Sequence, residues 1–414
     1  MTPQEEPTQR QAEVVVVGSE LLLGQIVDTN SAVIARQFAG IGLNLFYKTT
    51  VGDNLGRVTA VVRQALSRSD VIVTTGGIGP TADDITREAV AAATGRELVF
   101  SEELMRQIEA FFASRGFRLS PSNRRQAYIP AGALAVENPV GTAPAFIVEH
   151  GGKTVVTLPG VPREMEYLLV NRVVPYLRER YGMKGEIRLR VLKAVGLGES
   201  RIGELIADFM EKGRNPTVGT LAHLGQVDVR IAAKGADPQD AERLIAPVEA
   251  EIRSRLGDAI FGADDATLEG EIARRLGARG LQLALVEVGT AGLAAERLAG
   301  RAAGHFAGGI VVADAASLTR FGLEVAAADG PLERARALAA AVARRSGVGV
   351  GGATLLEPVP GSAPPLTHAA LAVAVEGASE AREHRLGGDP ASVRIRAATL
   401  LLDLIRRAVV EAKK

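Results

Sequence analysis

The segment VIVTTGGIGPTADD, residues 71–84, places an apolar strand, a glycine-rich turn and a helix start in direct succession. Glycines let a backbone bend sharply and bring its N–H groups close to a ligand. Those groups, with the positive end of the following helix, favour an anion such as a phosphate. The turn lacks the Gly-Lys-Ser/Thr of a P-loop and is not a strict dinucleotide fingerprint. A plain strand-to-helix turn with Asp as N-cap remains the alternative.

Strands and helices alternate around this segment. An apolar β-branched run at 14–17 predicts one strand, and 43–51 predicts a second; helical spacing marks 30–38, 55–66 and 84–93. This alternation is typical of right-handed crossovers, hence of a parallel sheet with helices on both faces. We therefore expect a doubly wound α/β domain here.

Polar residues follow three consecutive predicted strands: Gly18-Ser19-Glu20, Gly52-Asp53-Asn54 and the acids Asp83 and Asp84. Ligands of open parallel sheets bind beyond the carboxyl ends of the strands, so these residues should converge. Acids beside a phosphate repel it unless a cation such as Mg²⁺ bridges them. Asp53 alone is best explained as a helix cap. Together with Asp84 it predicts a two-carboxylate metal or general-base site.

The rest of the chain divides into two further blocks. Residues 186–256 predict a small β-α-β-α block, and Gly262-Ala263-Asp264-Asp265 looks like a linker. Strand and helix patterns then alternate again, with the turn Gly289-Thr290-Ala291-Gly292 after a strand at 281–286. The predicted domains are 1–181, 182–262 and 263–414.

Composition excludes several classes of protein. The 414 residues carry 48 basic and 48 acidic side chains, so no strong positive field attracts nucleic acid. The absence of cysteine excludes disulfides and thiolate sites, and 4% aromatics without Trp argue against base stacking. The first residues are polar and include acids, unlike a signal peptide, and no apolar run is long enough to span a membrane. We expect a cytoplasmic protein that contacts no membrane.

Five motifs in order resemble the CinA family (competence/damage-inducible protein A). Ser19 stands where many relatives have Thr, which keeps the hydroxyl. The motifs are Gly18-Ser-Glu-Leu-Leu-Leu-Gly-Gln-Ile-Val-Asp-Thr-Asn30, Thr50-Val-Gly-Asp-Asn54, Thr75-Gly-Gly-Ile-Gly-Pro-Thr-Ala-Asp-Asp84, Asn138-Pro-Val-Gly-Thr-Ala-Pro144 and Leu158-Pro-Gly-Val-Pro-Arg-Glu-Met165.

The resemblance implies a molybdopterin-binding-like N-terminal domain that hydrolyses ADP-ribose to AMP and ribose 5-phosphate with Mg²⁺ or another divalent cation. Asp53 and Asp84 are then catalytic, and Asp53, Asp83 and Asp84 are the metal ligands. Arg163 has the alternative of a solvated residue at a helix start. The expected phosphate and nucleotide contacts are Gly18, Ser19, Glu20, Gly76, Gly77, Gly79, Thr81, Asn138, Thr142 and Arg163.

The middle block resembles the KH-type domain of the same family. RNA-binding KH domains clamp the backbone with a basic Gly-x-x-Gly loop. Here Gly196-Leu-Gly-Glu199 has the wrong spacing and an acid, and Arg188, Arg190 and Lys193 fit a solvated strand face. We expect a structural or homodimer-contact role rather than nucleic-acid binding.

The last block is similar to the family's nicotinamide-nucleotide amidohydrolase domain, an α/β fold that converts NMN to nicotinate mononucleotide. The usual nucleophilic serine is Val288, the tyrosine is Asp314 and the lysine is Thr319, while a further loop is replaced around Gly351-Gly-Ala-Thr-Leu-Leu356. An alkyl side chain cannot attack an amide carbon, so we expect no NMN deamidase activity.

Some functional options remain for this last block. Thr290, Ser317 and His305 are possible substitutes, each better explained as a cap or surface residue. The helix start at 289–292 could still bind an anion. The alternatives to the hydrolase are a pterin- or nucleotide-binding protein without hydrolysis, an active NMN deamidase in pyridine nucleotide recycling, and a scaffold for DNA uptake or repair. The last of these needs a basic surface.

Overall fold

The computed structural model describes residues 10–183, 185–211, 213–323 and 330–409. The sequence features at residues 1–9 lie outside these ranges. The chain forms two compact units, residues 1–188 with 233–243 and residues 189–232 with 244–414, and each is described by itself. The three domain ranges expected from the sequence stay a prediction.

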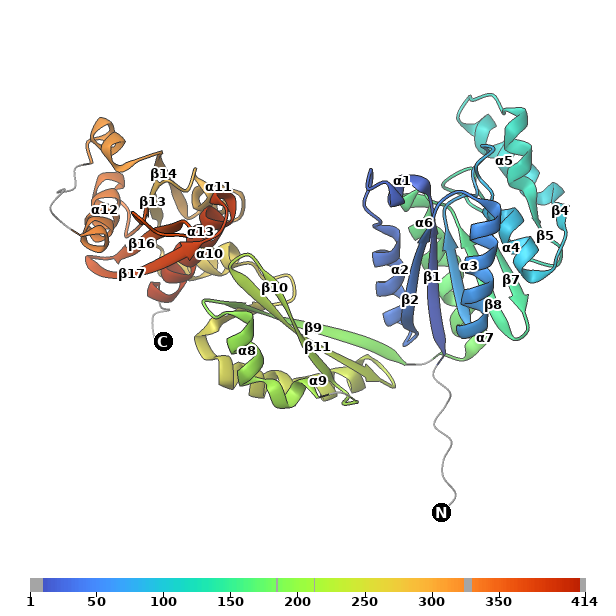
Figure 1. Cartoon of the computed structure of the whole chain (residues 1–414), viewed down its shortest axis with the longest axis horizontal. Helices are drawn as coiled ribbons and strands as arrows, with labels where there is room; N and C mark the ends of the chain where they lie inside the picture. The colour runs from blue at the N-terminus through green and yellow to red at the C-terminus, as the bar shows by residue number, and fades with distance from the viewer. Residues whose placement is uncertain (1–9, 184, 212, 324–329, 410–414) are drawn as a thin grey trace, which may run out of the picture. The chain divides into compact units, whose positions relative to one another are not determined.

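A six-stranded sheet organises the first unit (Figure 1). Its order is β2-β1-β3-β8-β7-β6; the first four strands are parallel, and β7 and β6 complete it in antiparallel fashion. The strands β7 and β8 form a hairpin that turns at Gly151-Gly152. The strands are β1 Gln11–Val17, β2 Asn44–Val51, β3 Val71–Thr75, β6 Leu134–Val136, β7 Ala145–His150 and β8 Lys153–Leu158.

Helices cover both faces of this sheet, which confirms the predicted doubly wound fold. Val14 and Val16 of β1 pack into one core and Val15 and Val17 into the other, because alternate side chains point to opposite faces. One core joins the sheet to α2 (Asn30–Ala39), α6 (Pro162–Leu168), η2 (Leu169–Val173) and α7 (Val174–Tyr181). The other joins it to α3 (Leu55–Arg68), α4 (Thr86–Thr94) and α5 (Glu102–Ser114), and the short α1 is Ser19–Leu22.

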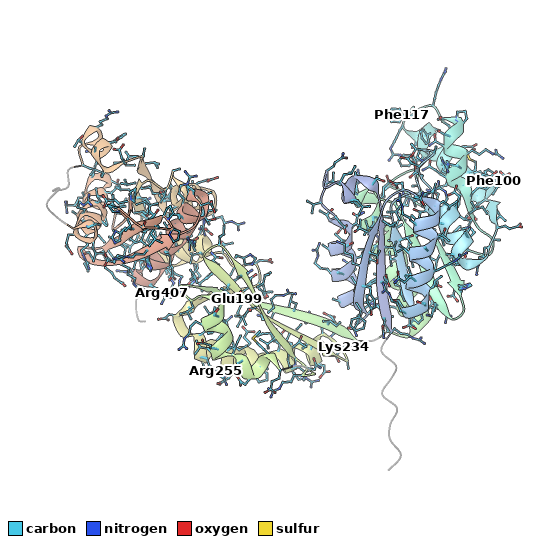
Figure 2. The ribbon with its side chains drawn as sticks, viewed as in Figure 1. Phe100, Phe117, Glu199, Lys234, Arg255 and Arg407 are labelled. Carbon is cyan, nitrogen blue, oxygen red and sulfur yellow. The ribbon has the colours of Figure 1, made fainter. Side chains whose placement is uncertain are left out.

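Two short strands form a separate sheet beside the six-stranded one. The strands β4 (Leu98–Phe100) and β5 (Tyr128–Pro130) pair, and the 3₁₀ helix η1 (Pro121–Ala127) precedes β5. Phe100, labelled in Figure 2, meets Tyr128 edge-on at 5.2 Å, and Arg124 lies over the Phe100 ring. These contacts fix η1 against the sheet pair.

The four-stranded sheet has the order β10-β11-β9-β12. The sequence missed β10 and β12, and the linker expected at 262–265 is wrong at its start because β12 pairs there with β9. Gly262 permits this, since a Cβ at that position would lie 2.4 Å from the Ala266 side chain. The elements are β9 Glu186–Val195, α8 Glu199–Leu205, η3 Ala207–Met210, β10 Thr217–His223, β11 Gln226–Gly235, α9 Pro238–Leu256, η4 Gly257–Ala259 and β12 Ile260–Ala263.

The C-terminal part is a second mixed α/β fold, with sheet order β14-β13-β15-β16-β17. Helices α10, α11 and α13 share one core with the sheet, and α12 shares the other. Val195 and Phe261 also belong to the first of these cores. The elements are α10 Leu268–Arg279, β13 Leu283–Val288, α11 Leu293–Arg301, β14 Phe306–Val312, η5 Ala315–Phe321, α12 Pro331–Ser346, β15 Val350–Pro358, β16 Leu366–Val375, β17 Ala378–Gly387 and α13 Pro390–Ala408.

No helix within the described ranges has both the length and the apolar character that crossing a bilayer requires.

Candidate functional site

The four parallel strands of the first unit end at one edge of the sheet, where a cavity of about 390 Å³ lies. The residues after β1, β2, β3 and β8 all contribute to its walls, as expected for an open α/β sheet. The walls contain the glycine turn 76–79 and five carboxylates, which are Glu20, Asp53, Asp83, Asp84 and Glu164. The structure thus brings the three predicted strand-end segments together.

The carbonyl groups of residues 76, 77 and 78 all face α4. The hydroxyl of Thr86 donates to the first at 2.8 Å, the N–H of Thr86 donates to the second at 2.9 Å, and the guanidinium of Arg87 donates to the third. In a trans peptide the N–H points away from the C=O, so the N–H groups of residues 77–79 leave the turn on the other side. Within the described chain, none of these three donates to a protein acceptor. Such a row of free donors is suited to an anion.

Two arginines hold the glycine turn and the acidic segment that follows it. Arg87 is buried and also donates to the carbonyl of Gly79 at 2.6 Å; burial lowers the pKa of Arg87 to about 10, so it stays charged near neutral pH. Arg125 of η1 donates to the carbonyl of Asp84 and to Glu88 Oε1, both at 3.1 Å. Guanidinium groups bonded to the carbonyls fix the direction of the loop peptides.

The turn requires glycine at two points. Gly76 has φ of 97°, and a Cβ there would lie 2.2 Å from the carbonyl oxygen of Val17. A Cβ at Gly79 would lie 2.6 Å from Asp84 Oδ2. Any side chain at these positions would displace the neighbouring strand end or the carboxylate.

Each predicted catalytic aspartate uses one carboxylate oxygen for the loop beside it. Asp84 Oδ2 accepts from the N–H and the hydroxyl of Thr81 at 2.8 and 2.6 Å. Asp53 Oδ2 accepts from the N–H of Ser19 at 2.8 Å, and the Ser19 hydroxyl accepts from the Asp53 N–H at 3.2 Å. Among the described residues, no donor is bound to the Oδ1 atom of either aspartate. One oxygen of each thus remains for a ligand.

This donor set suits a divalent ion that takes further ligands from a substrate. Mg²⁺ typically binds one or two carboxylates together with substrate phosphates and water. The free oxygens of Asp53 and Asp84, with the exposed Asp83 beside them, match that pattern. In the described part of the chain, no group of three or more His, Cys, Asp and Glu is placed to hold a metal by itself. The metal site therefore stays a prediction.

The other predicted binding residues differ in their positions. Gly18, Glu20 and Thr142 line the cavity with the glycine turn. A Cβ at Gly18 would lie 2.5 Å from Glu20 Oε1, so the Glu20 carboxylate folds back over this glycine. Ser19 and Thr81 act through the two aspartates rather than as part of the wall.

Asn138 and Arg163 also lie outside the cavity wall. Asn138 is fully buried, and its Nδ2 donates to the carbonyl of Ala143 at 2.9 Å and to Glu164 Oε2 at 2.6 Å. Its side chain thus orients Glu164 instead of meeting a ligand. Arg163 is exposed on α6.

Sequence reasoning missed four residues that shape the site: Glu164, Gln126, Arg87 and Arg125. Glu164 lies in the motif at 158–165, from which only Arg163 was predicted to contact the ligand. Arg125 and Gln126 lie on η1. The strands near it are too short to show a periodic pattern, so the sequence did not predict this segment. Arg87 lies in the helix predicted at 84–93, and its buried position depends on the tertiary fold.

The basic residues of β9 are paired with acids. Lys193 lies 3.0 Å from Asp228, and Arg190 lies 3.5 Å from Glu249. Arg188 lies 3.0 Å from Glu186. The predicted absence of nucleic-acid binding stays a prediction.

The C-terminal positions have structural contacts. Val288 is fully buried in the core of β13 and α12. Asp314 caps η5 by accepting from the N–H of Ser317 at 2.9 Å, and the Ser317 hydroxyl donates to it as well. The hydroxyl of Thr319 donates to the carbonyl of Ala316. The ring of His305 packs beside Gly277.

The start of α11 is filled by the protein's own carboxylate. Glu287 is fully buried, and it accepts from the hydroxyl of Thr290 at 2.5 Å and from the N–H groups of Ala294 and Ala295 at 3.1 and 2.7 Å. The donors that would hold an external anion at this helix start are therefore occupied.

Two family descriptions match the chain: "Probable molybdopterin binding domain" over residues 13–179 and "Damage-inducible protein CinA KH domain" over 189–262. A competence-damage inducible protein of Moorella thermoacetica is 43% identical over 349 residues, covering 82% of this chain and 84% of that protein. A relative of the same description from Alkaliphilus oremlandii is 35% identical over 412 residues, covering 96% and 98%. A solved structure of CinA "with unknown function" from Thermoplasma acidophilum is 38% identical, with TM-score 0.37, and covers 41% of this chain and 98% of that one.

Proposed function

Since this chain belongs to the CinA family, with a molybdopterin-binding-like domain followed by a CinA KH domain, we propose that its N-terminal cavity hydrolyses the phosphoanhydride of ADP-ribose. The products are AMP and ribose 5-phosphate. The observation that carries the proposal is the row of free N–H groups at residues 77–79 in a cavity that also holds Asp53 and Asp84.

The residues divide the work between binding and orientation. The N–H groups of residues 77–79 hold one phosphate; Arg87 keeps the turn in that shape, and Arg125 fixes the backbone at Asp84. Asp53 and Asp84, with Asp83, would hold a divalent cation such as Mg²⁺. When bound, that cation neutralises pyrophosphate charge and lowers the pKa of a coordinated water. Gly18, Glu20 and Thr142 shape the wall that faces the nucleotide.

Product analysis tests this proposal. The purified chain should release AMP from ADP-ribose with Mg²⁺ and should not do so with a chelator. Asp84→Asn should lower AMP release by about 100-fold or more, because one ligand oxygen and its charge are lost. Asp265→Asn, an exposed aspartate far along the chain, is the matched control and should leave the rate unchanged. A wild-type chain that gives no AMP with any divalent cation contradicts the proposal.

One observation favours a second candidate, a pterin- or nucleotide-binding protein without hydrolysis. The described residues contain no self-sufficient metal cluster. Under this alternative, ADP-ribose or a pterin phosphate binds with a measurable heat in calorimetry, and no AMP appears. The same pair of measurements thus separates the two candidates.

We propose that the C-terminal domain does not deaminate NMN. Its nucleophile position is the buried Val288, and Glu287 fills the helix start beside it. Incubation with NMN should give no nicotinate mononucleotide, and Val288→Ser should not create the activity. Appearance of that product from the wild-type chain contradicts this part of the proposal.

The middle domain is proposed to have a structural role or to form a homodimer contact. Light scattering, which measures the molar mass in solution, tests the homodimer.

A further inference from the structure

Glu164 is a half-buried carboxylate in the wall of the N-terminal cavity that the proposed mechanism does not use. It lies in the first turn of α6, directly after the turn that follows β8. Burial raises the pKa of Glu164 above its usual value, against the opposing effect of its hydrogen bond from Asn138.

The turn that leads to Glu164 is fixed against the glycine turn. The hydroxyl of Thr75, the last residue of β3, donates to the carbonyl of Pro159 at 2.9 Å. Asn30 Nδ2 donates to the carbonyl of Gly160 at 2.8 Å. A Cβ at Gly160 would lie 3.3 Å from the Cα of Gly76, so the two turns touch. These contacts therefore couple the position of the start of α6 to that of the glycine turn.

The carboxylate itself is held in one orientation. Nδ2 of the fully buried Asn138 donates to Glu164 Oε2 at 2.6 Å, and the Asn138 Oδ1 accepts from the N–H of Val140 at 3.2 Å. A Cβ at Gly141 would lie 1.9 Å from the carboxyl carbon of Glu164, so only glycine leaves room for this placement. Among the described residues, no arginine or lysine forms an ion pair with Glu164.

We infer that Glu164 is the general base of the N-terminal site, and that Asn138 is its positioning residue. The inference rests on the proposed hydrolysis. Water gives a proton to Glu164 while its oxygen bonds to one phosphorus. The bond from that phosphorus to the bridging oxygen breaks, and the leaving phosphate keeps the electron pair. Glu164 then releases the proton to solvent.

The charged groups around Glu164 are consistent with this role. Arg163 on the same helix lowers the pKa of Glu164, but by less than burial raises it. The remaining charges face it across the cavity from the ends of β1, β2 and β3, and all are acidic: Glu20, Asp53, Asp83 and Asp84. A carboxylate oriented by a neutral amide, without a cationic partner, keeps the basicity that proton transfer needs.

The test compares the wild-type chain with Glu164→Gln. General-base loss should lower kcat for ADP-ribose by about 100-fold to 10,000-fold. In the wild type, kcat should fall at low pH as Glu164 is protonated; in Glu164→Gln this acidic limb should disappear from the residual activity. AMP affinity and Mn²⁺ affinity, both measured by calorimetry, should stay within about twofold, because a base does not hold the ligand.

Two further variants guard against a folding artefact. Glu166→Gln, an exposed change on the same helix, should retain the wild-type rate and pH profile. Glu164→Asp should restore part of the rate together with the acidic limb. Retention of full rate and an unchanged pH profile in Glu164→Gln overturns the assignment alone, and so does loss of Mn²⁺ binding, which would make Glu164 a metal ligand. A wild-type chain without AMP release instead overturns the proposed function on which the assignment depends.

Discussion

The hydroxyl of Thr86 donates a hydrogen bond of 2.8 Å to the carbonyl oxygen of Gly76, and this contact sets the direction of the first peptide of the glycine turn. The acceptor is the first residue after β3, and the donor is the first residue of α4. One buried side chain thus links the strand, the turn and the helix that together form the predicted phosphate site.

Thr86→Val keeps the shape of the side chain but removes its hydroxyl, and this change should disturb the predicted phosphate site. The buried carbonyl of Gly76 loses a donor, at a cost of about 1–3 kcal/mol in the free energy of unfolding. The peptide is then free to rotate, so phosphate or AMP affinity should fall several-fold in calorimetry. Thr94→Val, where the hydroxyl bonds only within α4, is the control and should keep the wild-type affinity. Equal affinities in both variants would contradict the role given to Thr86.

Gly79→Ala should impair the site through Asp84. The added Cβ would meet Asp84 Oδ2 at 2.6 Å and push the carboxylate out of position. AMP release from ADP-ribose should fall by about 10-fold or more, while the thermal unfolding midpoint changes little. Gly198→Ala is the control, because a Cβ there meets no atom within 4 Å. Unchanged turnover in Gly79→Ala would show that Asp84 tolerates displacement.

The stability of the chain should depend on pH through Glu164. Burial raises its pKa in the folded state above the usual 4.5, so the folded protein binds this proton more tightly than the unfolded chain. Stability contributed in this way is present at low pH and is lost as pH rises through the folded pKa. Relative to the wild type, Glu164→Gln should therefore gain free energy of unfolding between about pH 4 and about pH 8. Urea titrations of both proteins at both pH values measure this gain. A difference in unfolding free energy that is the same at both pH values refutes the prediction.

Asp403→Ala should be strongly destabilising. Asp403 Oδ1 accepts from Arg406 at 2.7 and 3.0 Å, and the two side chains are only 6% and 3% exposed. Removal of the acid leaves a buried guanidinium without its counter-charge, at a cost of about 3–5 kcal/mol. The exposed pair of Arg201 and Glu204 is the control, and Glu204→Ala should cost less than about 1 kcal/mol in chemical unfolding. Similar losses in the two variants would contradict this ranking.

The sequence predicted the elements in which local patterns agree with the tertiary fold. The strand expected at the start of segment 71–84 is β3, Val71–Thr75. It is buried on both faces, and its β-branched residues Val, Ile and Thr favour a strand. The end of the predicted β-α-β-α block, residue 256, is also the last residue of α9, which begins at Pro238. Strand-end acids were expected together because parallel strands end at one edge, and Asp53 and Asp84 do line one cavity.

The elements that escaped prediction depend on contacts between distant residues. The strands β4, β5 and β6 have three residues each, too few to show alternation. Asn138 read as a ligand contact, whereas the fold buries it against Glu164. The role of Glu287 could not be seen either, because its carboxylate bonds N–H groups that exist only once α11 has formed.

Val195 and Phe261, from the two neighbouring strands β9 and β12, are embedded in the same apolar cluster as Leu268, Ile272 and Leu401. Removal of roughly the last 150 residues would therefore expose apolar, aggregation-prone surface on the sheet that contains β9 and β12. The C-terminal block thus has a packing role for the middle sheet that does not depend on any chemistry of its own.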